Sequence, residues 1–165
     1  MPLLFWDASA LAKRYYAEAG TETVNGIFEF DTALPRIVTF MGYAETAAIL
    51  RRKFNGGLLT ETEFQKARLI LQAEVLLNPG FDLLTITDQD ILDGMAITDR
   101  HNLNTADAAM LAAYLNRGRA DDTGLAACLL VASDKRLIRA ADAEGLRSLN
   151  PEAIFPTDLP QYLSL

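Results

Sequence analysis

The sequence has almost none of the residues on which histidine- or cysteine-based chemistry depends. His101 is its only histidine and Cys128 its only cysteine. A lone histidine without partner cysteines gives almost no basis for a histidine-based metal site or a nucleophile-histidine triad, and one cysteine excludes an internal disulfide. Because Cys128 lies within an apolar run, we expect it to be a small buried residue rather than a nucleophile.

Long hydrophobic runs are missing as well. No uninterrupted apolar run approaches the roughly 20 residues that cross a bilayer, and the N-terminus lacks a basic region followed by a cleavable apolar segment. We therefore expect a cytoplasmic protein that does not span a membrane.

Positive charge is scarce. The chain has 15 lysines and arginines against 22 aspartates and glutamates, which gives a formal net charge of -7. This balance argues against binding of nucleic acid by bulk electrostatic attraction alone. To bind a substrate that carries phosphates, the protein would need positive charge at the binding site itself, and divalent cations held by several carboxylates would supply it.

What the chain does have is an alternation of short apolar runs with segments of helical spacing. The runs predicted to be strands are residues 3–6, 36–39, 81–86, 125–134 and 147–149. Such alternation implies right-handed βαβ crossovers, and we predict a single α/β domain whose mostly parallel sheet of about four to five strands has helices on both faces. We expect this domain to cover residues 1–150 and a C-terminal tail, residues 151–165, to pack on it.

Two of the predicted strands run directly into an aspartate. Residues 3–6 lead into Asp7 and the run that begins at 125 leads into Asp134, and a helical pattern follows each. In open α/β sheets such strand-to-helix junctions line the ligand crevice. The alternative is that each aspartate only caps the next helix, because Asp is among the best N-cap residues. For either aspartate alone, the cap is the favoured interpretation.

Two further acids lie early in predicted helices. Glu45 lies beside the small-residue face of a helix over residues 41–54, and Asp107 lies in the first turn of a helix opened by Asn104 or Thr105. The helix dipole favours acids there by about 0.3–1 kcal/mol, so position alone does not settle their role. If the four acids share a pocket, their charges need compensating cations, and Mg²⁺ or Mn²⁺ suits such oxygen ligands.

Four fragments contain these acids: FWDASAL at 5–11, AE at 44–45, LNTADA at 103–108 and LVASDKRL at 130–137. In order and approximate spacing the set resembles the PIN-domain ribonucleases, and in particular the VapC-like toxins of type II toxin-antitoxin systems. The resemblance covers nearly the whole chain. It implies a PIN-like fold, a homodimer, and a small antitoxin protein that occludes the site.

The resemblance also implies a metal-binding acidic quartet, with a nearby hydroxyl from Ser9 or Ser133. The quartet consists of Asp7, Glu45, Asp107 and Asp134. The implied activity is Mg²⁺- or Mn²⁺-dependent hydrolysis of RNA phosphodiester bonds, in which bound metal lowers the pKa of an attacking water and stabilises the leaving oxygen. Candidates for contacts to RNA phosphates are Arg14, Arg51, Arg52, Lys135 and Arg136.

Two alternatives remain open. One is an aspartyl-phosphate phosphatase or receiver domain, which also places an aspartate after the first strand. A phosphatase of the haloacid-dehalogenase type would want a second aspartate two residues after Asp7, where Ser9 stands, and a receiver would want an acidic pair near the first strand. The other is a non-catalytic PIN-like scaffold or binding module in which the four acids are only caps or hold a structural ion.

Overall fold

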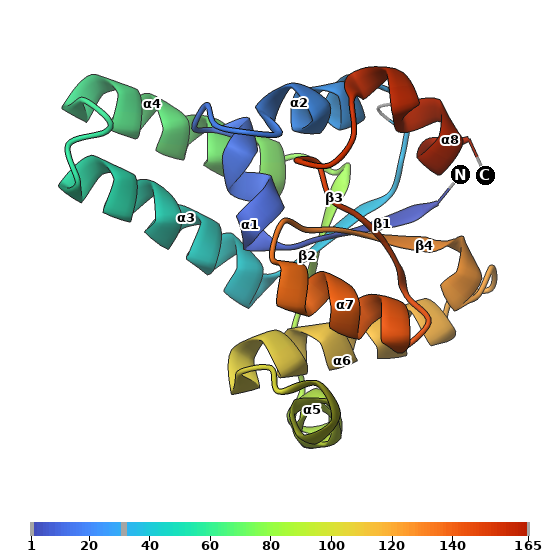
Figure 1. The fold of residues 1–165 in the computed structure, drawn as a ribbon. Coiled ribbons are helices and arrows are strands. Elements are labelled where there is room, and N and C mark those ends of the chain that lie inside the picture. The colour runs from blue at the N-terminus through green and yellow to red at the C-terminus, as the bar shows by residue number, and fades with distance from the viewer. Residues whose placement is uncertain (1, 31–32, 165) are drawn as a thin grey trace.

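The sheet has five parallel strands in the order β3-β2-β1-β4-β5 in the computed structural model, which describes residues 2–30 and 33–164 (Figure 1). The strands are β1 (Leu3–Trp6), β2 (Arg36–Thr39), β3 (Phe81–Leu84), β4 (Cys128–Val131) and β5 (Arg147–Leu149). The chain builds one half of the sheet outward from β1 and then returns to β1's other side with β4. The crevice between the carboxyl ends of β1 and β4 is therefore a topological switch point, where α/β proteins bind ligands.

Helices cover both faces of the sheet (Figure 1). One face packs against α1 (Ala8–Leu11), α2 (Thr21–Phe30), α3 (Phe40–Asn55), α4 (Glu61–Leu71) and α8 (Leu159–Leu163). The other face packs against α5 (Asp88–His101), α6 (Thr105–Arg119) and α7 (Lys135–Ala143). Short irregular turns of helix complete the described chain: η1 (Ala12–Arg14), η2 (Gln72–Leu76), η3 (Leu125–Ala127) and η4 (Pro156–Asp158). The predicted α/β class with a parallel sheet is confirmed.

The central strand shows why the runs at 3–6 and 128–131 contain no polar residue. Leu4 and Trp6 point into the core beneath α1 to α4, whereas Leu3 and Phe5 point into the core beneath α5 to α7. Side chains alternate between the faces of a strand, so a strand covered on both faces must be apolar at every position.

Two predicted strands are shorter in the structure. The strand predicted over residues 81–86 ends at Leu84, and in the run over 125–134 residues 125–127 form η3 and only Cys128–Val131 form β4. Helix α6 runs to Arg119, and a Cβ at Gly118 would lie 2.8 Å from Leu125 Cδ1, so the last turn of α6 packs directly against η3.

A buried tyrosine on α6 ties the ends of two strands together. The Tyr114 hydroxyl donates to the carbonyl oxygen of Trp6, at 2.7 Å, and accepts from the N–H of Thr39, at 3.2 Å. These two residues end β1 and β2. Because Asp7 follows Trp6 and Thr39 caps α3, this hydroxyl holds the starting points of two segments that carry candidate acids.

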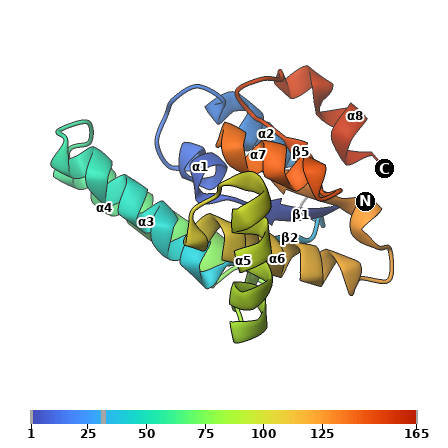
Figure 2. The same ribbon diagram turned by 60° about the horizontal axis from the view of Figure 1, so that its bottom comes forward.

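Helices α3 and α4 form an antiparallel hairpin that projects from the body of the domain (Figure 2). A capping box begins its second helix: the Thr60 hydroxyl accepts from the N–H of Glu63, and the Glu63 carboxylate accepts from the N–H of Thr60. In the described part of the chain, no helix is both long and apolar enough to cross a bilayer.

Candidate active site

A pocket of about 200 Å³ lies at the carboxyl ends of β1 and β4. Four elements of the fold contribute an acid to its wall: Asp7 follows β1, Glu45 lies on α3, Asp107 lies on α6 and Asp134 begins α7. The structure thus brings together four acids that lie far apart along the sequence. A larger hollow of about 390 Å³, between η1 and α4, contains none of them, and convergent chemistry rather than volume marks the smaller pocket as the candidate site.

Ser9 links the two strand ends that carry aspartates. Its N–H donates to Asp7 Oδ2 at 2.9 Å and its hydroxyl donates to the same oxygen. The Ser9 hydroxyl oxygen also accepts from the N–H of Ser133, at 2.9 Å, and from the N–H of Asp134, at 3.2 Å. One hydroxyl therefore fixes the β1 junction relative to the β4 junction.

The second hydroxyl expected near the site, that of Ser133, is differently placed. It is buried and has no hydrogen-bond partner among the described residues. Ser133 contributes to the site through its backbone N–H, which donates to the Ser9 hydroxyl oxygen as described above. Its side chain is a buried polar group that adjoins the site.

Asp134 and Asp107 are held by the starts of their helices. Asp134 Oδ1 accepts from the N–H of Arg136, at 2.7 Å, and from the N–H of Leu137, at 3.2 Å. Asp107 Oδ2 accepts from the amide nitrogen of the Asn104 side chain at 2.6 Å, while the Asp107 N–H donates back to Asn104 Oδ1 at 2.9 Å. The N-cap interpretation is therefore correct for Asp7 and Asp134, yet both caps also line the shared pocket.

The pocket concentrates negative charge. Burial raises the pKa of Asp7 from 3.8 to about 6; hydrogen bonds from Ser9 lower it, and the charges of Asp107 and Glu45 raise it further. Burial also raises the pKa of Asp107, against the lowering effect of its bond from Asn104. Loss of hydration raises the pKa of Glu45, and Asp107 adds to the rise while Arg52 opposes it.

The site's fit to a divalent metal rests on its free carboxylate oxygens. Among the described residues, no three Asp, Glu, His or Cys side chains are placed close enough to hold one ion together. Within the described chain, the carboxylate oxygens that accept no hydrogen bond are Asp7 Oδ1, Asp107 Oδ1, Asp134 Oδ2 and both oxygens of Glu45. An all-oxygen donor set suits a hard dication, which would offset the loss of hydration that raises the pKa values of Asp7, Asp107 and Glu45.

The five predicted phosphate-binding cations fall into three groups. Arg136 lines the acidic pocket, and Arg52 lies near enough to Glu45 to lower its pKa. Arg14 is instead bound to Glu74, with a shortest distance of 2.8 Å, and Arg51 lies over the ring of Phe64, 4.4 Å from its centroid.

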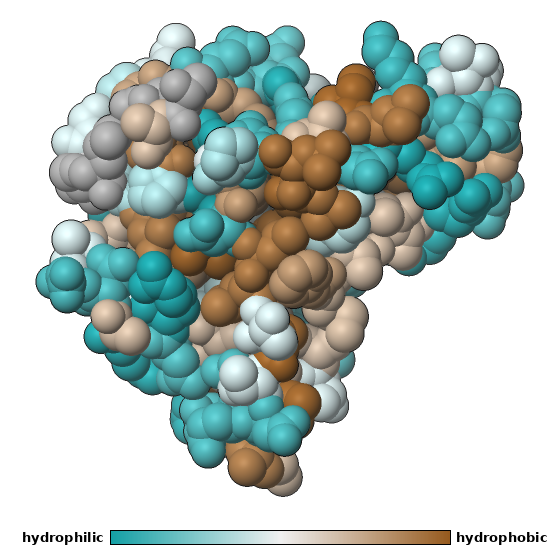
Figure 3. Space-filling model, turned by 180° about the vertical axis from the view of Figure 1, so that it is seen from behind, coloured by the Kyte–Doolittle hydropathy of each residue, from teal (hydrophilic) through white to brown (hydrophobic). Residues whose placement is uncertain are grey.

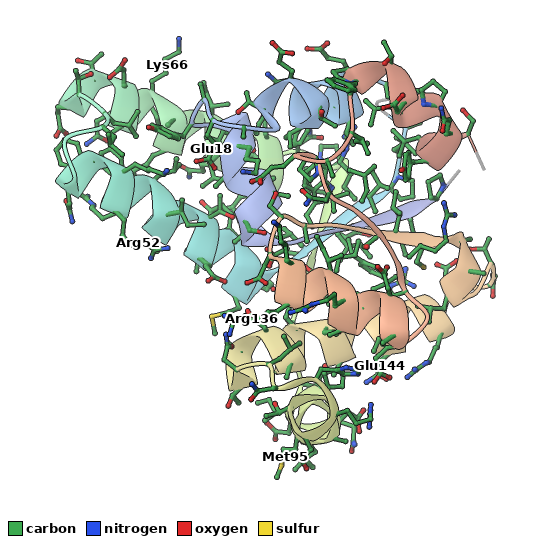
Figure 4. All side chains as sticks on the ribbon, in the orientation of Figure 1. Glu18, Arg52, Lys66, Met95, Arg136 and Glu144 are labelled. Atoms are coloured by element: carbon green, nitrogen blue, oxygen red, sulfur yellow. The ribbon has the colours of Figure 1, made fainter. Side chains whose placement is uncertain are left out.

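Lys135 lines a separate hollow beside the pocket. Figure 4 shows Arg52 on the outer half of α3, toward the tip of the α3–α4 hairpin, and Arg136 at the start of α7.

Four pocket residues were not predicted as site residues: Ala8, Ile49, Asn104 and Leu137. Asn104 was expected only to open a helix, and its position three residues before Asp107 was the one available signal, because an N-cap side chain reaches the third residue of its helix. Nothing in the sequence distinguishes Ile49 and Leu137 from the other apolar residues on their helices.

Several solved structures share this fold. The chain matches VapC20 of Mycobacterium tuberculosis, described as a toxin that cleaves the sarcin-ricin loop, with a TM-score of 0.64 and 16% identity over 90% of this chain and 99% of that one. It matches FitAcB of Neisseria gonorrhoeae with a TM-score of 0.61 and 14% identity over 92% and 100% of the two chains. A toxin-antitoxin complex from Klebsiella pneumoniae matches with a TM-score of 0.54 and 16% identity, over 90% and 97%.

No family model and no curated protein matches the sequence itself. At these identities the matches establish the fold, and they confirm the PIN-like fold that the resemblance implied.

Proposed function

From a fold shared with solved toxins of toxin-antitoxin systems, we propose that this chain is a metal-dependent endoribonuclease and the toxin of such a pair. The observation that carries the proposal is the convergence of Asp7, Glu45, Asp107 and Asp134 on one pocket at the switch point of the sheet. Asp7 is buried, Asp107 and Asp134 are half-buried, and none of the three takes part in an ion pair among the described residues. Carboxylates in such surroundings are costly unless a cation compensates them, so a bound dication explains their convergence better than helix capping alone.

Asp7 and Asp134 would hold Mg²⁺ or Mn²⁺ directly, and Asp107 would hold it directly or through water. Bound there, the metal would supply Lewis-acid stabilisation of a phosphoryl group and a lowered pKa for an attacking water. The hydrogen bonds from Ser9 and Asn104 fix the orientation of two of these carboxylates. No side-chain nucleophile is required.

Glu45 is suited to a different role. No hydrogen bond within the described chain engages its carboxylate, and loss of hydration raises its pKa. A carboxylate with a raised pKa is a better proton acceptor near neutral pH. We assign Glu45 to orienting and deprotonating the attacking water, and Arg136 and Arg52 to contacts with the substrate's phosphates.

The partners follow from the same proposal. RNA is the substrate, and a small antitoxin protein would block the pocket. Such a partner is present in the toxin-antitoxin complex from Klebsiella pneumoniae with the same fold.

Metal removal tests the activity. We expect the purified chain to cleave single-stranded RNA with Mg²⁺ or Mn²⁺, and to lose at least about 99% of that cleavage in EDTA, because the acidic pocket repels phosphate without the cation. Adding excess Mn²⁺ should restore it. The measurement is the initial rate on a fluorescein-labelled RNA, and cleavage that persists in EDTA would exclude the proposed mechanism. Intact RNA under every metal condition would favour the scaffold alternative.

We also propose that the chain forms a homodimer through an apolar surface over β3 and α5. Strand β3 is an edge strand of the sheet. Exposed hydrophobic residues on the elements before and after it include Leu76, Leu77, Ile91, Leu92 and Met95. Figure 3 shows apolar residues gathered over the middle of the rear face and continuing toward its lower end, where α5 lies. An exposed apolar patch of this kind is typical of a protein interface.

Charge introduced on α5 should break this dimer. Leu92 is 59% exposed and Met95 60% exposed, so replacing both with glutamate should leave the monomer folded while weakening association by at least about tenfold. Sedimentation velocity over a concentration series measures the change. The matched control is Leu58→Glu, 59% exposed at the turn of the α3–α4 hairpin. A wild-type chain that sediments as a monomer at all concentrations would refute the dimer.

A further inference from the structure

A second hollow lies beside the acidic pocket and has a different character. Its volume is about 380 Å³, and it is lined by Lys135, Ile138, Arg139 and Asn150. Three of these residues lie on one side of α7, and Asn150 directly follows β5. Because β4 and β5 are parallel, with Val131 opposite Leu149, the hollow occupies the same edge of the sheet as the acidic pocket, one strand further out.

The start of α7 joins the two cavities. Arg136 and Leu137 line the acidic pocket, whereas their neighbours Lys135 and Ile138 line the hollow. Figure 4 places Arg136 at the beginning of α7, between the α3 side of the site and the rest of α7. The two cavities therefore lie on different sides of the first turns of α7, at the same edge of the sheet.

Two exposed cations line the hollow. Lys135 and Arg139 are exposed and take part in none of the ion pairs found among the described residues. Arg139 Nε donates only to the carbonyl oxygen of Lys135, at 3.3 Å. In a chain with a net charge of -7, two adjacent cations left without acidic partners form a local site for anions.

The remaining surface of the hollow is suited to a base. Ile138 is half-buried and supplies an apolar floor between the two cations. Asn150 Oδ1 already accepts from the N–H of Glu152, at 2.9 Å. Its amide nitrogen is therefore the group left to donate to a ligand.

We propose that this hollow binds the nucleotide next to the scissile phosphate in a single-stranded RNA. The inference rests on the proposed ribonuclease function and adds to it a nucleotide-binding subsite. Lys135 and Arg139 contact the flanking phosphates, Ile138 supports the base, and Asn150 donates to the base edge. The strand is single because a base can rest on Ile138 only when it has left its stack.

The test removes the two cations and compares the result with an equal loss of charge elsewhere. The variant is Lys135→Gln with Arg139→Gln, and the control is Lys66→Gln with Arg68→Gln on α4, where Figure 4 shows Lys66 directed away from the acidic pocket. Binding is measured by fluorescence anisotropy with a labelled single-stranded RNA of mixed sequence, over a salt series. An Asp7→Asn background prevents cleavage during the measurement.

The expected result is a smaller dependence of affinity on salt. Each phosphate contact to a single strand contributes about 0.7 to the slope of log K against log salt, so losing two contacts should reduce the slope by roughly 1.4 while the control keeps the wild-type slope. In the cleavage-competent chain the same pair should raise KM about tenfold with kcat unchanged, because binding away from the reacting atoms is lost equally in ground and transition states.

A separate variant tests the base contact. Asn150→Asp retains the oxygen that accepts from the N–H of Glu152 but loses the amide donor. It should therefore change the preference among RNAs that differ at one position. Its salt slope should differ from that of the wild type by no more than the effect of one added negative charge. Thermal unfolding verifies that each variant is folded.

Two outcomes overturn the inference in distinguishable ways. In the first outcome, the wild-type chain cleaves RNA, and the Lys135/Arg139 variant has the same salt slope and KM as its control. This result refutes the nucleotide-binding subsite but leaves the proposed ribonuclease function standing. A wild-type chain that neither binds nor cleaves RNA refutes both. Equal competition by inorganic polyphosphate and RNA would show an anion site without a base contact and would also refute the subsite.

Discussion

Asp7→Asn is expected to reduce RNA cleavage by at least about 10²- to 10³-fold. Asp7 is 5% exposed and lies at the end of the central strand, where its side chain lines the acidic pocket. Asparagine keeps the shape and can still accept from the N–H of Ser9. It loses the charge that would attract a dication, so binding of metal and catalysis should fail together. Initial rates at saturating Mn²⁺ measure the loss.

The control for this substitution is Asp122→Asn, which removes the same charge from an exposed loop residue. It should retain the wild-type rate. Asp134→Asn should behave as Asp7→Asn does, because Asp134 lies at the adjoining strand junction. If Asp7→Asn and Asp134→Asn both cleave RNA at the wild-type rate, the acids are caps and the catalytic proposal is wrong.

Asp7→Asn should also stabilise the metal-free protein at neutral pH, by about 3 kcal/mol. Burial is the main reason that the pKa of Asp7 rises from 3.8 to about 6, and a rise of that size corresponds to about 3 kcal/mol of differential stability. Between those two pH values the folded chain binds more protons than the unfolded chain. The contribution of Asp7 to the free energy of unfolding therefore falls as pH rises through this range. Above this range, the loss of stability caused by the ionised Asp7 reaches its full value.

Urea denaturation of both proteins in EDTA, from pH 4 to pH 7, measures this effect. The two free energies of unfolding should agree near pH 4 and diverge by about 3 kcal/mol at pH 7, with Asp7→Asn the more stable. Mg²⁺ or Mn²⁺ should close part of this gap by stabilising only the wild type. Parallel curves across the pH range would contradict the origin proposed for the pKa of Asp7.

The sequence was sufficient to predict the fold class and the meeting of four acids. Apolar runs at 3–6 and from residue 125 indicated strands covered on both faces, and parallel strands must bring Asp7 and Asp134 to the same edge. Glu45 and Asp107 were harder to identify as site residues, because an acid early in a helix is a common structural feature. The resemblance to a known family, rather than their spacing, singled out those two.

The finer arrangement could not be read from the sequence, because it depends on tertiary contacts. Nothing near Arg14 in the sequence shows that Glu74 binds it 60 residues away. Likewise, Ser9 was expected as a nearby hydroxyl, but its bonds to the backbone of residues 133 and 134 required the packing of β1 beside β4. The third case is Arg139, which gains importance only because β5 brings Asn150 alongside it.

The position of β1 in the middle of the sheet has a consequence for a chain emerging from the ribosome. Its first strand supplies Asp7 at once, but that residue's neighbours in the pocket include Asp107 and Asp134, and the hydroxyl of Ser9 finds its backbone donors only when β4 has been made. A nascent chain that has folded its first hundred residues still lacks half of the acids. The pocket is therefore complete only when the last third of the chain has been translated and β4 has packed beside β1.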